Sequence, residues 1–125
     1  MRYLLDTNAL VYFLEDAVTG FQGIEDGDEV HFSFITRIEL FCGNIDEEEI
    51  FTITRFLKEF GEFSVDEGIV ERTIYVRKKY GLKIPDAIIV ATAIEKGLSL
   101  VTADKEILKR VKDIEIIDPL EWSKA

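Results

Sequence analysis

The sequence predicts an α/β protein with a central parallel β-sheet. Short apolar runs with the length and alternation of strands recur along the chain, and segments with helical spacing of apolar residues lie between them. Strands that alternate with helices pair in parallel and are joined by right-handed crossovers. The chain has 125 residues, 47% of them apolar, with two prolines and eight glycines. These values favour one domain over residues 1–125, without long linkers.

The expected strands are short. Residues 3–5 form an apolar run that ends at Asp6, and residues 30–34 alternate as a half-buried strand does. A further apolar run leads into Thr102-Ala103-Asp104. In chain order, strands are expected at residues 3–5, 30–34, 63–65, 98–102 and 115–117.

Helices are expected in the intervals. Helix 46–60 has three Glu residues in its first turn, where the helix dipole favours negative charge, and helix 66–80 ends at Gly81, a natural C-cap. The helix that begins at Pro85 is apolar nearly all round as far as Ile94, so we expect it to be buried. Helices are expected at residues 8–15, 36–42, 46–60, 66–80, 85–96 and 105–111. The side chains expected to face inward from the third and fourth of these are Ile50, Ile53, Leu57, Phe60, Ile69, Val70, Ile74 and Tyr75.

Composition excludes several classes of protein. With 15 basic and 25 acidic residues the net charge is −10, which disfavours broad electrostatic capture of nucleic acid and suits a chain that binds metal or a basic partner. Cys42 is the only cysteine, so neither an intrachain disulfide nor a cysteine-based zinc site is available. The N-terminus reaches a charge too early for a signal peptide, and the longest apolar stretch, 87–94, is too short to span a bilayer. We therefore expect a cytoplasmic protein that does not engage membranes.

Four acidic residues stand where the chain passes from one apolar element to the next. Asp6 ends the first strand and Asp104 follows the fourth, while Glu39 and Asp86 lie on intervening helices. Each has an ordinary interpretation when taken alone. The three aspartates resemble helix-capping or helix-starting residues, and Glu39 resembles a solvated side chain.

Taken together, the four acids predict a cluster. Ligands of parallel sheets bind at the C-terminal ends of the strands, where Asp6 and Asp104 are expected, and the helices that carry Glu39 and Asp86 can reach that edge. Carboxylates packed together raise one another's pKa, so such a cluster is stable mainly as a cage for a hard divalent cation. These four residues are thus the predicted metal-binding and catalytic residues of a metal-dependent phosphodiesterase.

Other hydrolytic chemistries lack their residues. His31 is the sole histidine and lies in a predicted strand, so a ribonuclease with paired histidines is impossible. No complete Ser/His/Asp set is present, and Cys42 has only the distant His31 as a base. The chain also has no glycine-rich phosphate loop. Metal-activated water is the remaining hydrolytic mechanism.

Basic residues are sparse but grouped beside two of the acids. One group precedes Asp86 and the other begins directly after Asp104. For any single residue, a solvated helix face is the simpler interpretation. The candidates for contact with RNA phosphates are Arg77, Lys78, Lys79, Lys83 and Lys105.

Four stretches in order give the chain a family resemblance over essentially its full length. They are Leu4-Leu5-Asp6-Thr7-Asn8, residues 34–40 around Glu39, Ile84-Pro85-Asp86 with the apolar helix that follows, and Leu100-Val101-Thr102-Ala103-Asp104. In order and spacing they resemble the PIN-domain family, and within it the VapC-type toxin ribonucleases of toxin–antitoxin pairs.

The resemblance implies a three-layer α/β/α fold, Mg²⁺ or Mn²⁺ as cofactor, and cleavage of RNA to products with 5′-phosphate and 3′-OH ends. It also implies a homodimer and a cognate antitoxin whose C-terminal tail covers the site; the acidic charge of this chain suggests that the tail is basic. By position, Asp6, Glu39, Asp86 and Asp104 match the acidic quartet of the family. The supporting polar positions of the family are matched by Thr7, Asn8 and Thr102.

Two other classes of protein have comparable features. A PIN-like RNA-binding module without catalysis would share the fold, although the acidic positions are intact here. A response-regulator receiver domain would share the length, the parallel sheet and an acidic pocket. Receivers have an acidic pair after the first strand, whereas Asp6 is followed by Thr7.

Overall fold

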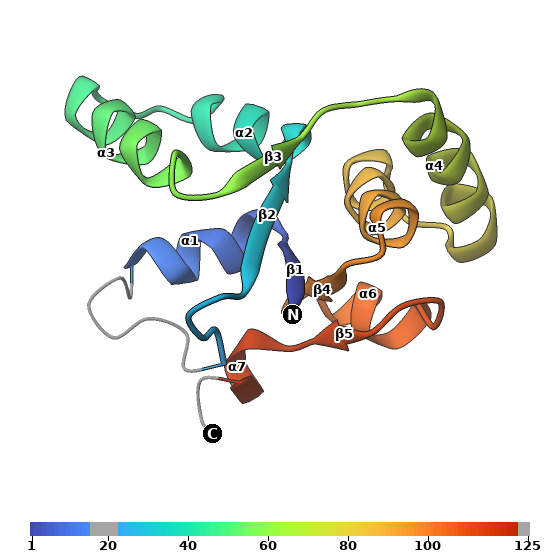
Figure 1. Cartoon of the computed structure of the whole chain (residues 1–125). Helices are drawn as coiled ribbons and strands as arrows, with labels where there is room; N and C mark the ends of the chain where they lie inside the picture. The colour runs from blue at the N-terminus through green and yellow to red at the C-terminus, as the bar shows by residue number, and fades with distance from the viewer. Residues whose placement is uncertain (16–22, 123–125) are drawn as a thin grey trace.

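Helices cover both faces of one parallel sheet in the computed structural model, which describes residues 1–15 and 23–122 (Figure 1). Within these residues the sheet has five strands in the order β3-β2-β1-β4-β5, and every neighbouring pair is parallel. The strands are β1 (Arg2–Leu5), β2 (Glu29–Ser33), β3 (Gly61–Phe63), β4 (Ser99–Val101) and β5 (Ile116–Ile117). The helices are α1 (Thr7–Glu15), α2 (Phe34–Phe41), α3 (Glu47–Leu57), α4 (Glu67–Tyr80), α5 (Ile84–Lys96), α6 (Lys105–Arg110) and α7 (Pro119–Trp122).

The side-chain alternation of β1 and β4 divides the core into two layers. Leu4 and Leu100 point to the face that is covered by α4, α5 and α6. Leu5 and Val101 point to the opposite face, where they pack with residues of α1 and α3. This arrangement confirms the predicted three-layer α/β/α fold with a central parallel sheet. Figure 1 shows α1, α2 and α3 on one side of the strands and α4 and α5 on the other.

Helix α5 is the buried helix of the fold, as its composition predicts. Six of its residues, from Ala87 to Ala93, are buried between the sheet and α4. Its ends follow ordinary rules, since Pro85 lies in the first turn and Gly97 closes the helix in the left-handed conformation with φ of 69°. No helix among the described residues combines the length and the apolar character that a membrane crossing requires.

The expected inward face of α4 is wrong in part. Ile69 and Val76 are buried, but Val70, Ile74 and Tyr75 are exposed. The buried pair is spaced by seven residues, which is two helical turns, so α4 contacts α5 along a narrow stripe. The apolar residues on either side of that stripe face solvent. A simple apolar periodicity overestimates the width of such a contact.

The helix predicted at 46–60 also ends earlier than expected. Helix α3 stops at Leu57, which is buried together with Ile53, whereas Ile50 is exposed and Phe60 is half-buried beyond the helix. The strand expected at 63–65 lies at Gly61–Phe63, in register with His31 to Ser33 of β2. A Cβ atom on Gly61 would lie 2.4 Å from Nδ1 of His31, so β3 approaches β2 at a residue without a side chain.

The start of α3 offers a test of the local structure. The Asp46 carboxylate accepts a hydrogen bond of 2.8 Å from the Glu49 N–H, and Glu49 Oε1 accepts one of 3.4 Å from the Asp46 N–H. This reciprocal capping box satisfies two N–H groups that the helix cannot pair internally. We expect Asp46→Ala to lower the free energy of unfolding by about 1 kcal/mol. Urea unfolding measures the change, and Asp46→Asn, which still caps, should lose much less.

Candidate active site

Asp6 and Asp104 lie where the strand order of the sheet reverses. Strands β1 and β4 are neighbours, but their crossovers lead in opposite directions along the sheet. In an open parallel sheet this position leaves a crevice at the C-terminal strand ends, where ligands bind. Asp6 directly follows β1, and Thr102 directly follows β4. The backbone remains in the sheet here, because the Asp6 N–H donates to the Val101 carbonyl at 3.1 Å.

Asp6 is the most enclosed of the four acids, with a relative exposure of 6%. Its Oδ1 accepts a 2.8 Å hydrogen bond from the Ala9 N–H at the start of α1, and its Oδ2 accepts a bond from the Thr102 hydroxyl. Burial and, less strongly, the charges of Asp104 and Asp86 raise the pKa of Asp6 to about 6, against the lowering effect of the two hydrogen bonds. Asp6 is therefore both a helix cap and a carboxyl group with a raised pKa.

Asp104 also caps a helix. Its Oδ1 accepts hydrogen bonds from the N–H groups of Glu106 at 2.9 Å and Ile107 at 3.1 Å. These two bonds cap the N-terminus of α6. Its own N–H donates to the Thr102 hydroxyl oxygen at 3.0 Å. Thr102 is thus a bridge between Asp6 and Asp104, and its supporting role in catalysis stays a prediction. The capping and metal-binding interpretations of Asp104 are compatible, because both capping bonds use the same carboxylate oxygen.

Asp86 lies in the first turn of α5 and is half-buried. Burial raises its pKa, followed by the charges of Asp104 and Glu39, while Lys83 lowers it. The charges of both expected neighbours, Asp104 and Glu39, therefore act on Asp86. The charges of Asp104 and Asp86 likewise raise the pKa of Asp6, and Asp86 and Asp104 line one cavity.

Glu39 is the outermost acid of the four, on the exposed side of α2. Its Oε1 accepts a 2.6 Å hydrogen bond from the Thr7 hydroxyl, and the Thr7 hydroxyl oxygen lies 3.0 Å from that of Thr36. The predicted supporting residue Thr7 thus contacts one of the acids, whereas Asn8 is exposed in the first turn of α1. The fully buried Thr36 was not predicted; its place one helical turn before Glu39 is a signal that the sequence does contain.

These side chains suit a hard divalent cation in their chemistry. All four are carboxylates, and their mutual repulsion is relieved by positive charge between them. Among the described residues, no group of three or more His, Cys, Asp or Glu side chains is placed so that it could hold a metal ion. Mg²⁺ retains several waters and often takes only one or two carboxylates directly, so an open arrangement fits it.

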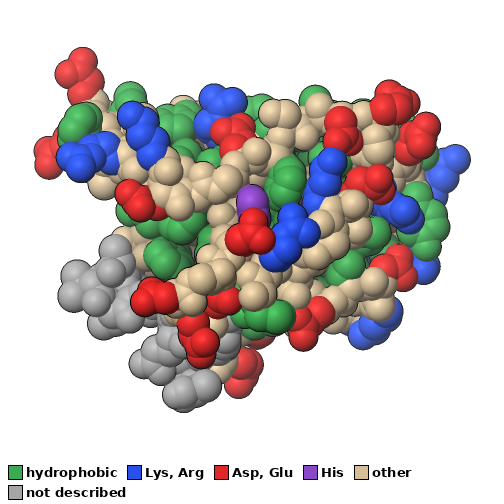
Figure 2. Space-filling view, in the orientation of Figure 1, with side chains coloured by type: hydrophobic (Ala, Val, Ile, Leu, Met, Phe, Trp, Pro, Cys, Tyr) green, Lys and Arg blue, Asp and Glu red, His purple; other side chains and the backbone are tan. Residues whose placement is uncertain are grey.

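The five predicted phosphate-binding residues divide into three groups. Arg77 donates to the Leu82 carbonyl at 2.8 Å, and Lys79 forms a 3.1 Å ion pair with Asp113, so both are occupied in structural contacts. Lys78 and Lys105 are exposed on α4 and α6. Lys83 alone of the five lines a cavity with two of the acids. On the face shown in Figure 2, acidic and basic side chains are interspersed over the surface.

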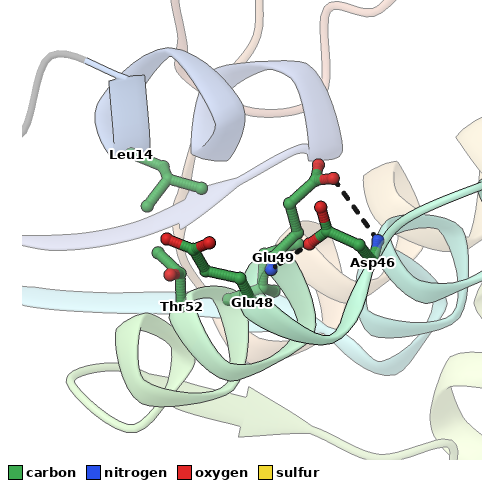
Figure 3. Close-up of a pocket in the computed structure, with 6 residues that line it drawn as sticks. Leu14, Asp46, Glu48, Glu49 and Thr52 are labelled. Carbon is green, nitrogen blue, oxygen red and sulfur yellow. Dashed lines mark hydrogen bonds between the residues drawn. The ribbon is translucent and has the colours of Figure 1, made fainter.

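A separate acidic cavity lies between α1 and α3. Figure 3 shows Leu14 of α1 facing Glu48, Glu49 and Thr52 of α3, with the capping box at one end. The cavity has a volume of about 240 Å³. Glu49 is bonded within its own helix start, so its carboxylate serves the fold. None of the four predicted catalytic acids lines this cavity.

Comparison with known proteins identifies the family. A family model described as PIN domain matches residues 3–114. The chain belongs to the PIN domain family. The strand order of this PIN domain also excludes the receiver interpretation, because receivers place their strands in the order 2-1-3-4-5. No curated protein sequence matches the chain significantly.

Solved structures share the fold of this PIN domain almost end to end. A toxin–antitoxin complex from Klebsiella pneumoniae contains a chain 27% identical, with a TM-score of 0.75, over 94% of this chain and 97% of that one. DNA-bound VapBC from Salmonella typhimurium contains a chain that is 20% identical, with a TM-score of 0.81. The match covers 95% of this chain and 98% of that one. VapBC2 from Rickettsia felis, bound to a DNA fragment from its promoter, contains a chain that is 18% identical, with a TM-score of 0.78. The match covers 93% of this chain and 97% of that one.

Proposed function

We propose that this PIN domain is a metal-dependent endoribonuclease and the toxin of a toxin–antitoxin pair. The observation that carries the proposal is the geometry at the switch point of the sheet, where Thr102 bridges Asp6 and Asp104, and Asp86 lines one cavity with Asp104. The similarity of this PIN domain to chains of toxin–antitoxin complexes supports the toxin role. We also propose a cytoplasmic location.

In this proposal the four carboxylates would hold Mg²⁺ or Mn²⁺. When bound, the ion supplies positive charge that polarises the phosphodiester and lowers the pKa of water. Thr102 orients the carboxylate of Asp6, and Thr7 orients that of Glu39. Asp6 is enclosed, so the effective dielectric around its carboxylate is low and its interaction with a bound cation would be strengthened.

The decisive experiment is RNA cleavage by the purified chain. We expect Mg²⁺ or Mn²⁺ to support cleavage to products with 5′-phosphate and 3′-OH ends, and a chelator to stop it. A chain that binds the same RNA but never cleaves it with either ion would instead be a non-catalytic binding module.

A cationic antitoxin tail is the proposed partner. The net charge of −10 and the acidic site favour a basic segment over a polyanion. We expect the tail to insert an Arg or Lys among the four acids, more readily Arg, because its planar fork binds two carboxylate oxygens at once.

Metal competition tests this arrangement. Excess Mg²⁺ at constant ionic strength should weaken binding of the tail, and replacement of its inserted cation by Ala should restore RNA cleavage. Isothermal titration and a cleavage assay measure the two effects. If binding ignores divalent metal and no basic residue of the tail matters, inhibition occurs elsewhere.

A homodimer is proposed as well. Val70 and Ile74 lie four residues apart on α4 and are 41% and 52% exposed. Apolar side chains on one helix stripe are the kind of surface that a second copy of the chain would cover.

A further inference from the structure

A cavity beside the acidic cluster brings cations and anions together. It has a volume of about 330 Å³ and opens between the α4–α5 turn and helix α6. Asp86, Asp104 and Glu106 contribute three carboxylates to its wall, and Lys83 and Arg110 contribute two cations. Lys83 stands at the N-cap of α5 and lies in the field of Asp86, whose pKa it lowers. The cavity is therefore continuous with the proposed active site.

Two guanidinium groups hold the wall that carries Lys83. Arg77 of α4 donates to the Leu82 carbonyl at 2.8 Å, and Arg110 of α6 donates to the Tyr80 carbonyl at 3.2 Å. Gly81 between these carbonyls has φ of 66°, and a Cβ atom there would lie 3.7 Å from Nη1 of Arg110. The turn is thus fixed from both helices, so Lys83 is carried on a positioned segment of backbone.

Arg110 has binding capacity beyond this clamp. Its Nη2 lies 2.8 Å from Glu106 Oε2, one turn earlier on α6, and both side chains are about half exposed, at 45% and 59%. An exposed pair of this kind contributes little free energy, so a phosphate can take the place of Glu106. A guanidinium has five N–H donors in a planar fork, which matches the oxygens of a phosphate.

We propose that Lys83 and Arg110 form a phosphate subsite, which binds the RNA phosphodiester next to the one that is cleaved. The inference rests on the proposed function, because Asp86 and Asp104 in the same cavity mark the position of the scissile phosphate. A chain of net charge −10 repels a polyanion at long range. Its affinity for RNA must therefore come from a few cations placed beside the acids.

Neutral variants test the subsite. Arg110→Gln removes the guanidinium charge, and Lys83→Gln removes the second charge. We expect each variant to raise the Kd for a labelled single-stranded RNA in EDTA about tenfold. Each should also reduce the slope of log Kd against log salt by about 0.7, the value for one phosphate contact on a single strand. In Mg²⁺, KM should rise by more than kcat falls.

Two further variants give matched comparisons. Lys109→Gln removes the same charge from an exposed position of α6 outside the cavity wall, so its Kd should stay close to that of the parent. Glu106→Gln releases Arg110 and should lower the Kd, and this gain should vanish in an Arg110→Gln background. Arg110→Lys should recover most of the lost affinity, because it restores the charge.

The outcomes separate this inference from the nuclease proposal. Unchanged Kd and salt slope in both Gln variants, or an equal loss in Lys109→Gln, would overturn the subsite. A parent chain with no affinity for the RNA would overturn it too. Absence of cleavage with either metal contradicts the nuclease function, while the Kd ratios still decide whether Lys83 and Arg110 bind phosphate.

Discussion

Asp6→Asn and Asp86→Asn should each slow RNA cleavage by on the order of 10²-fold or more, a loss of about 2.7 kcal/mol of transition-state stabilisation. Both substitutions keep the shape of the side chain and remove its charge. In Asp6→Asn the amide oxygen can still accept from the Ala9 N–H, so the start of α1 is retained. The expected loss therefore reflects the missing carboxylate rather than a disturbed fold. Single-turnover cleavage of a defined RNA measures it.

The double variant sharpens this test. If both carboxylates act on one metal-dependent step, the combined loss should be far smaller than the product of the single losses. Asp46→Asn is the matched control, because the same change there lies in the capping box of α3. Cleavage at the parent rate in both single variants would mean that Asp6 and Asp86 are structural residues only.

Local patterns predict the parts of the site that follow strand ends. Asp6 and Asp104 come directly after apolar runs, and the parallel topology brings such ends to one edge. The burial of α5 follows equally from its uninterrupted apolar composition. Both features depend on residues that are close in sequence or on a general rule of sheet topology, so sequence is sufficient for them.

Contacts between distant residues are beyond such patterns. The bond from Arg110 to the Tyr80 carbonyl joins residues thirty positions apart, and it decides that Arg110 rather than Arg77 lines the cavity with the acids. The exposed face of α4 is similar, since the width of its contact with α5 depends on how closely the two helices approach. The exact place of β3 depends on the His31 ring beside Gly61. Each of these is fixed by packing between elements, which a linear pattern does not record.

The metal-free protein should lose stability as the pH rises through the folded-state pKa of Asp6. Burial raises that pKa to about 6, against an ordinary value of 3.8. Between these values the folded state binds the proton and the unfolded state does not, so rising pH favours unfolding. The stabilisation is fully present below pH 3.8 and is lost above pH 6. The pKa shift of Asp6 corresponds to about 3 kcal/mol in the free energy of unfolding. The raised pKa of Asp86 changes the stability in the same direction.

Urea unfolding in EDTA from pH 4 to pH 8 measures this effect as a difference between variants. Relative to the parent, Asp6→Asn should gain about 3 kcal/mol across that range, because it lacks the group whose ionisation is penalised. Asp113→Asn is a contrasting control: the hydrogen bond from Lys79 lowers the pKa of Asp113 below its ordinary value of 3.8, so its difference from the parent should stay nearly constant over this pH range. Saturating Mg²⁺ should bind the ionised carboxylates in the folded state. It should therefore reduce the pH dependence of the difference in unfolding free energy between the parent and Asp6→Asn. A difference between the parent and Asp6→Asn that stays constant with pH would contradict the coupling of burial and charge at this carboxylate.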